Sequence, residues 1–387
     1  MAFIPYGRQD VTQADIDQVV AVLKSDFLTQ GPMIPRFEEK VAAYCGASHA
    51  VAVNSATSAL HIACLALGVG EGDWLWTSPI TFVASANCGL YCGASIDFVD
   101  ISPASYNICP EALSRKLQEA EKLGRLPKVV VAVHLTGQSC DMESIHQLSR
   151  KYGFYVIEDA SHAVGGSYRD DKVGCGKFSD ITVFSFHPVK IITSAEGGMA
   201  LTNNSELASR MELFRSHGIT RNPEVFNREP DGPWYYEQVD LGLNYRLTDI
   251  QAALGLSQME RLDAYVEKRH ALAARYDRLL AELPITCPMQ SQECYSGFHL
   301  YVIRLQLANS AVSHRELFER LRECNIGVNL HYIPVYRQPY FARMGFTPSD
   351  YPQAEAYYRE AISIPMYATL EEQQQDQVVA ALRDILT

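Results

Sequence analysis

The sequence lacks the features of a membrane-spanning, secreted or nucleic-acid-binding protein. No apolar run approaches the length of about 18 residues that a membrane-spanning helix needs. The N-terminal segment has no long apolar core like that of a signal peptide. Positive charge is scarce, since 33 lysines and arginines accompany 45 acids and give a formal net charge of −12. This balance argues against a nucleic-acid or anionic-membrane partner, and we expect a soluble, cytoplasmic protein.

Paired cysteines are also missing from the sequence. The ten cysteines are scattered, and none forms a Cys-x-x-Cys motif. We therefore expect free thiols rather than a disulfide framework, and no bound metal. The chain has no internal repeat and no low-complexity tract. Its 47% hydrophobic and 20% charged residues are ordinary values for a globular enzyme.

Strand and helix patterns alternate along the first two thirds of the chain. Helical segments such as 112–122 and 142–152 separate most of the short apolar runs. This alternation predicts an α/β fold with a mostly parallel, seven-stranded sheet that helices cover on both faces. The runs expected as strands are 49–53, 74–77, 96–99, 129–133, 155–157, 181–184 and 198–201.

The pattern changes after residue 245. A strongly helical stretch covers residues 245–282, and strands such as 300–305 and amphipathic helices at 314–324 and 370–386 follow it. The change predicts a second, smaller α+β domain. We expect a large cofactor-binding domain with an N-terminal arm over residues 1–257 and a small C-terminal domain over residues 258–387.

Asp159 and Lys190 are the most informative residues of the sequence. Asp159 follows the expected strand at 155–157, and Lys190 comes just beyond the strand at 181–184. A lysine can form a Schiff base with the aldehyde of pyridoxal 5′-phosphate, and an aspartate can keep the pyridine nitrogen protonated. Alone, each is more often a solvated lysine or a helix cap. However, apolar neighbours surround Lys190 in the sequence and would lower its pKa, which makes the amine nucleophilic.

A phosphate-binding turn is expected at residues 54–58. Small and hydroxyl-bearing residues stand there between a strand and a helix, where backbone N–H groups and the helix dipole favour an anion. Ser185, five residues before Lys190, could reach the same phosphate. The alternatives are an ordinary capped turn at 54–58 and a serine that bonds the backbone at its strand end.

Other residues could complete a cofactor site. Phe82 could stack on a planar ring, and His162 could lie against the opposite ring face, although both residue types are often plain core groups. The glycines of the segment 196–198 permit a backbone turn that a side chain would block. Asn244 and Arg246 are donors suited to an anion.

Six segments stand in a fixed order along the chain, and together they are more specific than any one of them. They are Asn54–Leu60, Pro79–Ala84, Glu158–Ala163, Phe184–Lys190, Glu196–Gly198 and Asn244–Gly255. In this order they resemble the DegT/DnrJ/EryC1/StrS family of sugar aminotransferases, over essentially the whole chain. One departure is Ala195, where many members of the family have glycine. The segments 4–9, 24–32, 296–301 and 328–336 resemble a branch of the family that acts in pseudaminic acid biosynthesis.

The resemblance implies an aspartate-aminotransferase fold (fold type I), bound pyridoxal 5′-phosphate, and a homodimer with both active sites at its interface. It implies that Lys190 holds the cofactor and that Asp159 pairs with its ring nitrogen. The further cofactor contacts that it implies are Ala56, Thr57, Phe82, His162, Ser185 and, from the neighbouring subunit, Asn244. The implied sugar-binding residues are Tyr6, Asp26, Phe27, Leu28, Thr29, Asn329, Leu330, His331 and Tyr332.

The resemblance also implies a reaction. An amino group would pass from L-glutamate to the 4-keto carbon of a UDP-linked 6-deoxy-N-acetylhexosulose. Three alternatives stay open: an aminotransferase for another nucleotide 4-keto sugar (of the 4-amino-4-deoxyarabinose or viosamine type), a deoxygenating dehydratase, and a non-catalytic regulator on the same fold. The dehydratase branch replaces the lysine with histidine and a regulator would lack the lysine or the aspartate, so Lys190 and Asp159 argue against both.

Overall fold

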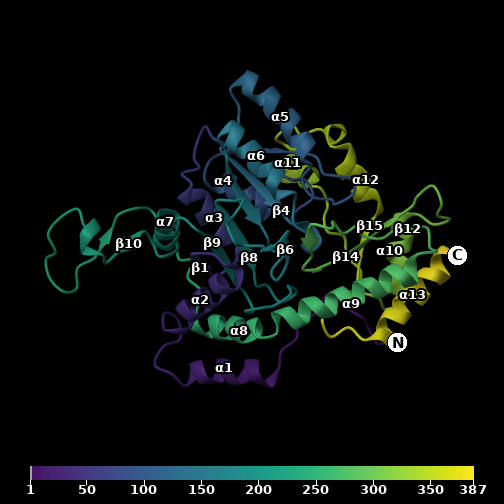
Figure 1. The fold of residues 1–387 in the computed structure, drawn as a ribbon, viewed down its shortest axis with the longest axis horizontal. Coiled ribbons are helices and arrows are strands. Elements are labelled where there is room, and N and C mark those ends of the chain that lie inside the picture. The colour runs from purple at the N-terminus through teal and green to yellow at the C-terminus, as the bar shows by residue number, and fades with distance from the viewer. Residues whose placement is uncertain (1) are drawn as a thin grey trace.

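The centre of the protein is a seven-stranded sheet, seen here in a computed structural model that describes residues 2–387 (Figure 1). Six strands point the same way, and β9 runs antiparallel to both of its neighbours. The strand order across the sheet is β1 (His49–Val53), β9 (Gly198–Thr202), β8 (Ile181–Ser185), β5 (Tyr155–Asp159), β4 (Val129–Val133), β2 (Trp74–Thr77) and β3 (Ser95–Phe98).

Helices cover both faces of this sheet because its strands are apolar on both sides. In β4, for example, Val129 and Val131 pack with the helices on one face, while Val130 and Ala132 pack with those on the other. One face carries α3 (Ala56–Ala66), α4 (Ala84–Tyr91) and α7 (Ser205–Arg215). The other face carries α2 (Met33–Cys45), α5 (Pro110–Leu123), α6 (Met142–Tyr152) and α8 (Asp249–Met259).

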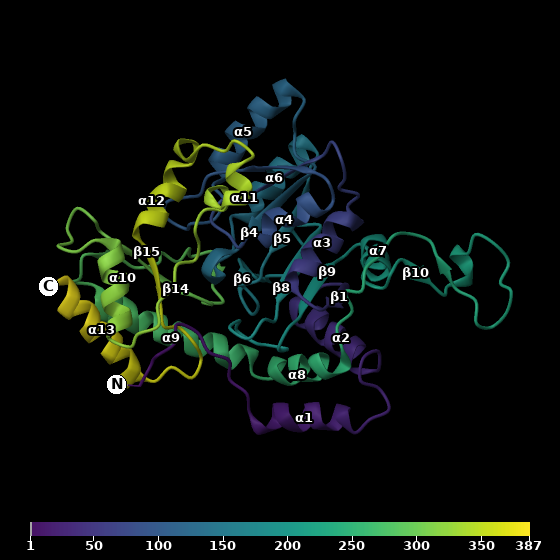
Figure 2. The same cartoon turned by 180° about the vertical axis from the view of Figure 1, so that it is seen from behind.

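The C-terminal part forms a second layer of sheet and helices. The long helix α9 (Leu262–Leu280) leads to it from the large sheet (Figures 1 and 2). An antiparallel sheet of β12 (Ile285–Thr286), β14 (Tyr301–Leu305) and β15 (Ala361–Ile364) shares a core with α9, α10 (His314–Glu323) and α13 (Glu372–Leu386). The domain boundary proposed between residues 257 and 258 falls within the last turn of α8 and stays a prediction.

Shorter elements connect these layers. A hairpin arm around β10 (Ile219–Thr220) and β11 (Glu237–Gln238) projects away from the large sheet, on the side opposite the small one (Figure 2). The remaining elements are α1 (Gln13–Leu23), α11 (Pro339–Ala342), α12 (Pro352–Glu360), the strands β6 (Ser167–Tyr168), β7 (Asp171–Lys172) and β13 (Cys294–Tyr295), and single 3₁₀ turns at Leu135–Gly137, Pro223–Val225, Val335–Arg337 and Pro348–Asp350.

Among residues 2–387, no helix is both long and apolar enough to cross a lipid bilayer. All ten cysteines are unpaired, as the spacing predicts. The same residues contain no group of three histidines, cysteines or acids placed to hold a metal ion.

Helix α1 attaches to α8 through a buried acid. Asp15 is fully buried, and its carboxylate accepts hydrogen bonds from Ser257 Oγ (2.6 Å), Gln258 Nε2 (3.0 Å) and Arg261 Nη2 (2.6 Å). Burial by itself raises the pKa of Asp15, but the hydrogen bonds from Arg261, Ser257 and the Thr12 backbone lower it to about 2. This cluster fixes which face of α1 is turned inward.

The outward face of α1 is apolar. Ile16, Val20 and Leu23 recur at helical spacing, a pattern that in a surface helix ordinarily marks the buried side. Here all three are exposed, and Leu23 is 55% exposed. The apolar stripe of this helix therefore faces away from the core of its own chain.

The Asp15 cluster predicts a specific loss of stability. Replacing Asp15 with alanine leaves the Arg261 guanidinium without its acid, and we expect the free energy of unfolding at pH 7 to fall by about 3 kcal/mol. Urea denaturation of wild type and Asp15→Ala measures this difference. Asp17→Ala, on the exposed side of the same helix turn, is the control and should change stability by less than about 0.5 kcal/mol.

The pH dependence follows from the lowered pKa. Because Asp15 binds its proton more weakly in the folded than in the unfolded chain, its contribution is complete above about pH 4 and is lost as the pH falls toward 2. The difference between wild type and Asp15→Ala should shrink over that interval. Equal losses for Asp15→Ala and Asp17→Ala at pH 7 would contradict the argument.

Candidate active site

Seven of the eight predicted cofactor residues, all except Asn244, line one cavity of about 910 Å³ at the carboxyl ends of the parallel strands. The sheet register explains the meeting, because Gly198 of β9 pairs with Val53 at the end of β1 and with Ser185 at the end of β8. Asp159 ends the neighbouring strand β5 and pairs with Val183 of β8. Ligand sites of open α/β sheets commonly lie at this edge.

Asp159 is buried and held by three hydrogen bonds. Its Oδ2 accepts a bond from Ser85 Oγ (2.7 Å), and its Oδ1 accepts bonds from the hydroxyl (2.6 Å) and the backbone N–H (3.2 Å) of Ser161. Ser85 lies on α4 and is itself bonded to Thr81. The carboxylate therefore has a fixed position at the floor of the cavity.

Lys190 lines the same cavity, in the loop that follows β8. Burial lowers the pKa of its amine to about 8, although the nearby Asp159 carboxylate acts in the opposite direction. About a tenth of the amine is then neutral at pH 7, compared with well under a thousandth for an exposed lysine. The surroundings thus prepare Lys190 to act as a nucleophile and as a proton carrier.

The predicted phosphate turn lies opposite these two residues. Ser55 caps α3 by accepting a hydrogen bond from the Ser58 N–H (3.1 Å), and Ser58 Oγ donates to Asn54 Oδ1 (2.6 Å). Ala56 and Thr57 form the first turn of α3 and line the cavity. First-turn N–H groups have no acceptor within their own helix, so they offer an anion site at the positive end of the helix dipole.

The cavity has the donor set that pyridoxal phosphate needs. It combines a lysine amine with a lowered pKa, a fixed carboxylate, and a helix N-terminus with the hydroxyl of Ser185 beside it. These groups match the aldehyde, the ring nitrogen and the phosphate of that cofactor.

Gly198 is a steric requirement of the phosphate turn. A Cβ at this position would lie only 2.5 Å from the Ala56 nitrogen and from the carbonyl group of Ser55. Both are backbone atoms of the turn and cannot rotate away. The sequence predicts glycine at 196–198 for a backbone turn, and the structure shows that Gly198 is needed instead for the close approach of β9 to the phosphate turn.

Ala195 occupies the position where many members of the resembled family have glycine. Its φ of +67° lies in the left-handed region that favours glycine, which costs an alanine about 1 kcal/mol. The Thr193 hydroxyl accepts a hydrogen bond from the Ala195 N–H (3.0 Å) and supports this turn. The strain stays local, since Ala195 does not line the cavity.

Two of the predicted ring-contacting residues, Phe82 and His162, line the cavity. Nδ1 of His162 accepts a hydrogen bond from the Thr136 N–H (3.3 Å), so its Nε2 carries the proton and donates to the Tyr332 hydroxyl (3.2 Å). Burial, followed by the charge of Lys190, lowers the pKa of His162 far below its usual value. The histidine is therefore neutral at pH 7. That Phe82 and His162 flank a bound ring stays a prediction.

The C-terminal part supplies the opposite wall. Tyr6 and the segment 329–332 line the cavity, and the Tyr6 ring lies 5.3 Å from that of His331. Ser363 Oγ is 2.8 Å from His331 Nδ1, and burial lowers the pKa of His331 to about 3. These residues were predicted to bind the sugar.

Five predicted residues do not line the cavity of their own chain. The segment 26–29 is exposed beside α8, where the Leu28 carbonyl accepts a hydrogen bond from the Asp249 N–H (3.1 Å). Asn244 is exposed too, and only its backbone carbonyl approaches the phosphate turn, at 3.5 Å from Asn54 Nδ2. Their roles stay predictions.

Several residues that line the cavity or bond Asp159 escaped the sequence analysis as site residues. Ser161, two residues after Asp159, had a signal, because a serine in that position commonly bonds the preceding carboxylate in a tight turn. Ser85 had none, since it depends on how α4 packs on the sheet. His299 reaches the cavity from the C-terminal part, with its ring 4.5 Å from that of His162.

A second cavity of about 910 Å³ lies beside the edge strand β3. Two of its acids already have partners: Lys116 bonds Asp97 (2.7 Å), and Asp100 accepts hydrogen bonds from the backbone N–H groups of Gln353 and Ala354. None of the predicted site residues lines it. The chemistry is therefore expected in the first cavity.

Known proteins match the chain over nearly all of its length. The sequence pattern of the DegT/DnrJ/EryC1/StrS aminotransferase family matches residues 9–383. The spore coat polysaccharide biosynthesis protein SpsC of Bacillus subtilis is 38% identical over 388 residues, which cover 99% of this chain and 97% of SpsC. The UDP-4-amino-4,6-dideoxy-N-acetyl-beta-L-altrosamine transaminase of Campylobacter jejuni is 38% identical over 366 residues, 94% of this chain and 92% of its own.

Solved structures match the fold equally well. PseC of Helicobacter pylori, described as an aminotransferase involved in the biosynthesis of pseudoaminic acid, has a TM-score of 0.90 at 32% identity over 99% of both chains. The putative sugar aminotransferase Spr1654 of Streptococcus pneumoniae has TM-scores of 0.89 in its PLP form and 0.90 in its PMP form, at 27% identity over 97–100% of the chains. The predicted fold class and the predicted resemblance are confirmed.

The steric role of Gly198 gives a test of the cavity as a cofactor site. Gly198→Ala should raise the dissociation constant for pyridoxal phosphate at least tenfold, because the added methyl group displaces the phosphate turn. Fluorescence titration of the apoprotein measures this constant. Gly70→Ala is the matched control, since a Cβ there meets no atom within 4 Å. Equal constants for the two variants would refute the assignment of the turn.

Proposed function

Since the chain belongs to the DegT/DnrJ/EryC1/StrS aminotransferase family and is an aminotransferase, we propose that it transfers an amino group from L-glutamate to the 4-keto carbon of a UDP-linked 6-deoxy-N-acetylhexos-4-ulose. The product is UDP-4-amino-4,6-dideoxy-N-acetyl-β-L-altrosamine, in pseudaminic acid biosynthesis. The observation that carries the proposal is Lys190 beside the fixed Asp159, opposite a helix N-terminus in one cavity. The similarity to the Campylobacter and Helicobacter enzymes supports the choice of sugar.

The cavity residues have separate roles in holding pyridoxal phosphate. Lys190 binds it covalently through its aldehyde, and Asp159 binds the ring nitrogen. Ala56, Thr57 and Ser185 bind the phosphate, while Phe82 and His162 lie on the two ring faces. When bound, the cofactor supplies an aldehyde that condenses with amines and a ring that accepts the electron pair left by a departing proton.

Lys190 has two tasks in each half of the reaction. With the cofactor bound, the Lys190 amine would be released when the amino group of glutamate takes its place. The free amine could then take the proton from the α-carbon of glutamate and hold it for return, while the cofactor would supply the electron sink. A pKa of about 8 suits both tasks, because the amine gives and takes protons near neutral pH.

The fixed position of Asp159 and the neutral state of the buried histidines limit the number of charged groups near the ring nitrogen. The hydrogen bonds from Ser85 and Ser161 hold the carboxylate where the ring nitrogen is expected, so no reorganisation is needed when positive charge persists on that nitrogen. His162 is neutral, because its pKa is lowered by burial and by Lys190. It therefore does not compete with the ring for Asp159.

A second candidate is amination of a different nucleotide 4-keto sugar. The B. subtilis protein named for spore coat polysaccharide biosynthesis is as similar to this chain as the altrosamine transaminase is, at 38% identity each. The two candidates share the cofactor residues and the donor half of the reaction. They differ in how Tyr6 and the segment 329–332 hold the sugar.

We also propose that the enzyme works as a cytoplasmic homodimer. The apolar stripe of α1 runs on into Phe27, which is 55% exposed, and Leu28. Such a stripe is typical of a surface that a second chain covers. In this arrangement the segment 26–29 and Asn244, which do not line their own cavity, complete the cavity of the partner.

The central test replaces Lys190. Lys190→Ala should lose transamination by at least about a thousandfold, together with the visible absorbance of the lysine-bound cofactor. Addition of L-glutamate to wild type should shift that absorbance. Lys151→Ala, a surface lysine on α6, is the control and should behave as wild type in both measurements.

A panel of UDP-linked 4-keto sugars separates the two candidates in the same experiment. The primary proposal expects amination of the 6-deoxy-N-acetylhexos-4-ulose with the configuration of the altrosamine product, as read by NMR. Preference for another 4-keto sugar favours the second candidate. Full turnover by Lys190→Ala would refute both candidate functions.

The dimer proposal has its own test. Leu23→Asp places a charge in the apolar stripe and should raise the dissociation constant of the dimer at least tenfold, because burial of a leucine side chain contributes roughly 2 kcal/mol. Sedimentation equilibrium measures the constant. Gln18→Asp adds the same charge to an exposed site on the opposite face of α1 and should leave self-association unchanged. A monomeric wild type, or equal effects of both variants, would exclude this interface.

A further inference from the structure

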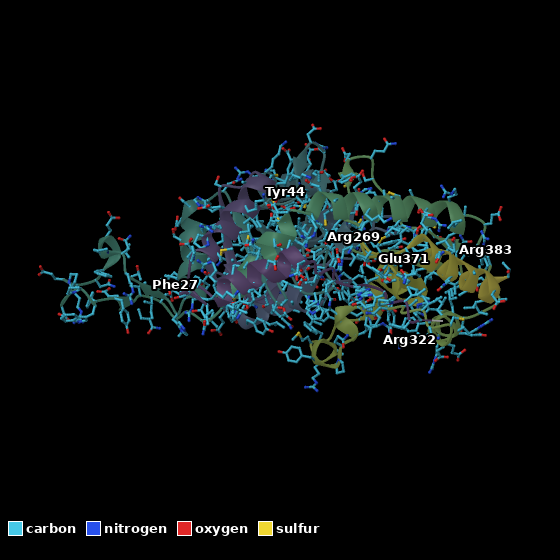
Figure 3. The ribbon with its side chains drawn as sticks, turned by 90° about the horizontal axis from the view of Figure 1, so that it is seen from below. Phe27, Tyr44, Arg269, Arg322, Glu371 and Arg383 are labelled. Atoms are coloured by element: carbon cyan, nitrogen blue, oxygen red, sulfur yellow. The ribbon has the colours of Figure 1, made fainter. Side chains whose placement is uncertain are left out.

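Arg269 is a buried cation that no acid neutralises. It lies on α9, is 1% exposed, and takes part in none of the salt bridges formed within residues 2–387. Its Nε has no hydrogen-bond partner among these residues. Burial of a charge costs desolvation free energy unless its contacts contribute more than that cost. The contacts of Arg269 therefore indicate its role. Figure 3 labels Arg269 near the middle of the molecule, between Phe27 and Arg383.

The contacts of Arg269 are three backbone carbonyls from two distant segments. Nη1 donates to the carbonyl oxygens of Phe298 (3.0 Å), His299 (3.2 Å) and Met366 (3.0 Å). The first two residues precede β14, and Met366 follows β15. Nη1 of Arg269 thus links the segment just before β14 with the segment just after its neighbouring strand β15.

Each of these segments carries a wall of the active-site cavity. His299 lines the cavity itself, with its ring 4.5 Å from that of His162. Met366 donates its backbone N–H to the Tyr6 carbonyl (2.9 Å), and Tyr6 lines the cavity as well. The guanidinium therefore bonds the backbone of one cavity residue, His299, directly and is linked to a second one, Tyr6, through Met366.

The segment before His299 needs this support. Phe298 has a φ of +44°, which a phenylalanine rarely adopts. The Phe298 N–H donates to Ser296 Oγ (3.0 Å), and its carbonyl accepts the bond from Arg269. Without the guanidinium, only the first of these bonds would hold the strained residue.

We propose that Arg269 is a positioning residue of the active site, whose guanidinium fixes His299 and Tyr6 through the carbonyls of Phe298, His299 and Met366. The proposal builds on the proposed function in one respect: Tyr6 and His299 form the wall nearest the segment 329–332, which is expected to bind the sugar. Arg269 touches neither substrate nor cofactor and acts only through these backbone groups.

The charge of Arg269 has a second effect at the same place. Burial lowers the pKa of His299 far below its usual value, and the charges of Lys190 and Arg269 act in the same direction. His299 stays neutral beside the neutral His162. Loss of the guanidinium should therefore change the environment of the His299 ring even in the absence of substrate.

The test compares three variants of the full chain. Arg269→Met removes the donors at similar volume and should raise the KM for the sugar at least tenfold, with a smaller change in kcat. Arg269→Lys should restore the KM to within threefold of wild type at pH 7, because its ammonium offers three N–H donors for the three carbonyls that the two N–H groups of Nη1 share in wild type. Gln375→Met is the structural control: Gln375 is equally buried and donates to the Leu272 carbonyl of α9, and neither of these residues lines the cavity.

A second measurement needs no turnover. The ¹⁵N resonances of His299, assigned with a His299→Gln variant, should shift in apo Arg269→Met and stay in place in apo Gln375→Met. If wild type aminates none of the sugars, the proposed function fails while this measurement still decides the role of Arg269. If Arg269→Met does not fold, Arg269→Gln takes its place. A variant that lowers only the melting temperature, as Gln375→Met does, would overturn the proposal.

Discussion

The parallel pairing of β5 with β8 is the constraint on which the active site depends. In this register Asp159 ends β5 beside Val183, and the chain continues from β8 through Ser185 to Lys190. A shift by one residue would turn Asp159 toward the helices on the other face, since side chains alternate along a strand. Buried apolar residues on both faces of this pair, such as Val156, Ile157 and Phe184, help to hold the register. Core packing and chemistry are thus set by the same pairing.

At this position, burial and the charge of Asp159 have opposite effects on the pKa of Lys190. Burial makes the Lys190 amine easier to deprotonate, whereas the carboxylate of Asp159 favours its charged form, and burial prevails. The Asp159 carboxylate stays separate from the Lys190 amine because the hydroxyl groups of Ser85 and Ser161 donate hydrogen bonds to it. The neutral histidines around the cavity add no further charge. The site therefore keeps one acid and one base available for a cofactor whose own charge they match.

The sequence predicts the part of the site that local patterns encode. All seven strands lie where apolar runs place them, and the Asp159–Lys190 pair with the turn at 54–58 follows from strand ends. The sequence does not predict those site residues whose positions depend on packing between distant segments. Ser85 reaches Asp159 only through the docking of α4, and His299 only through the return of the C-terminal part. The outward stripe of α1 is a similar case, because the buried Asp15 decides the orientation of the helix.

The two halves of the cavity have different origins, and this separates cofactor chemistry from substrate choice. Strand ends and helix N-termini of the large sheet form the cofactor half, where a single methyl group at Gly198 would collide with backbone. Tyr6, His299 and the segment 329–332 form the other half, and backbone contacts near Met366 and Arg269 join it to the rest. The second half can change shape while the first is conserved in geometry. This separation agrees with the equal similarity, at 38% identity each, of the chain to one relative named for spore coat polysaccharide biosynthesis and to another named as an altrosamine transaminase.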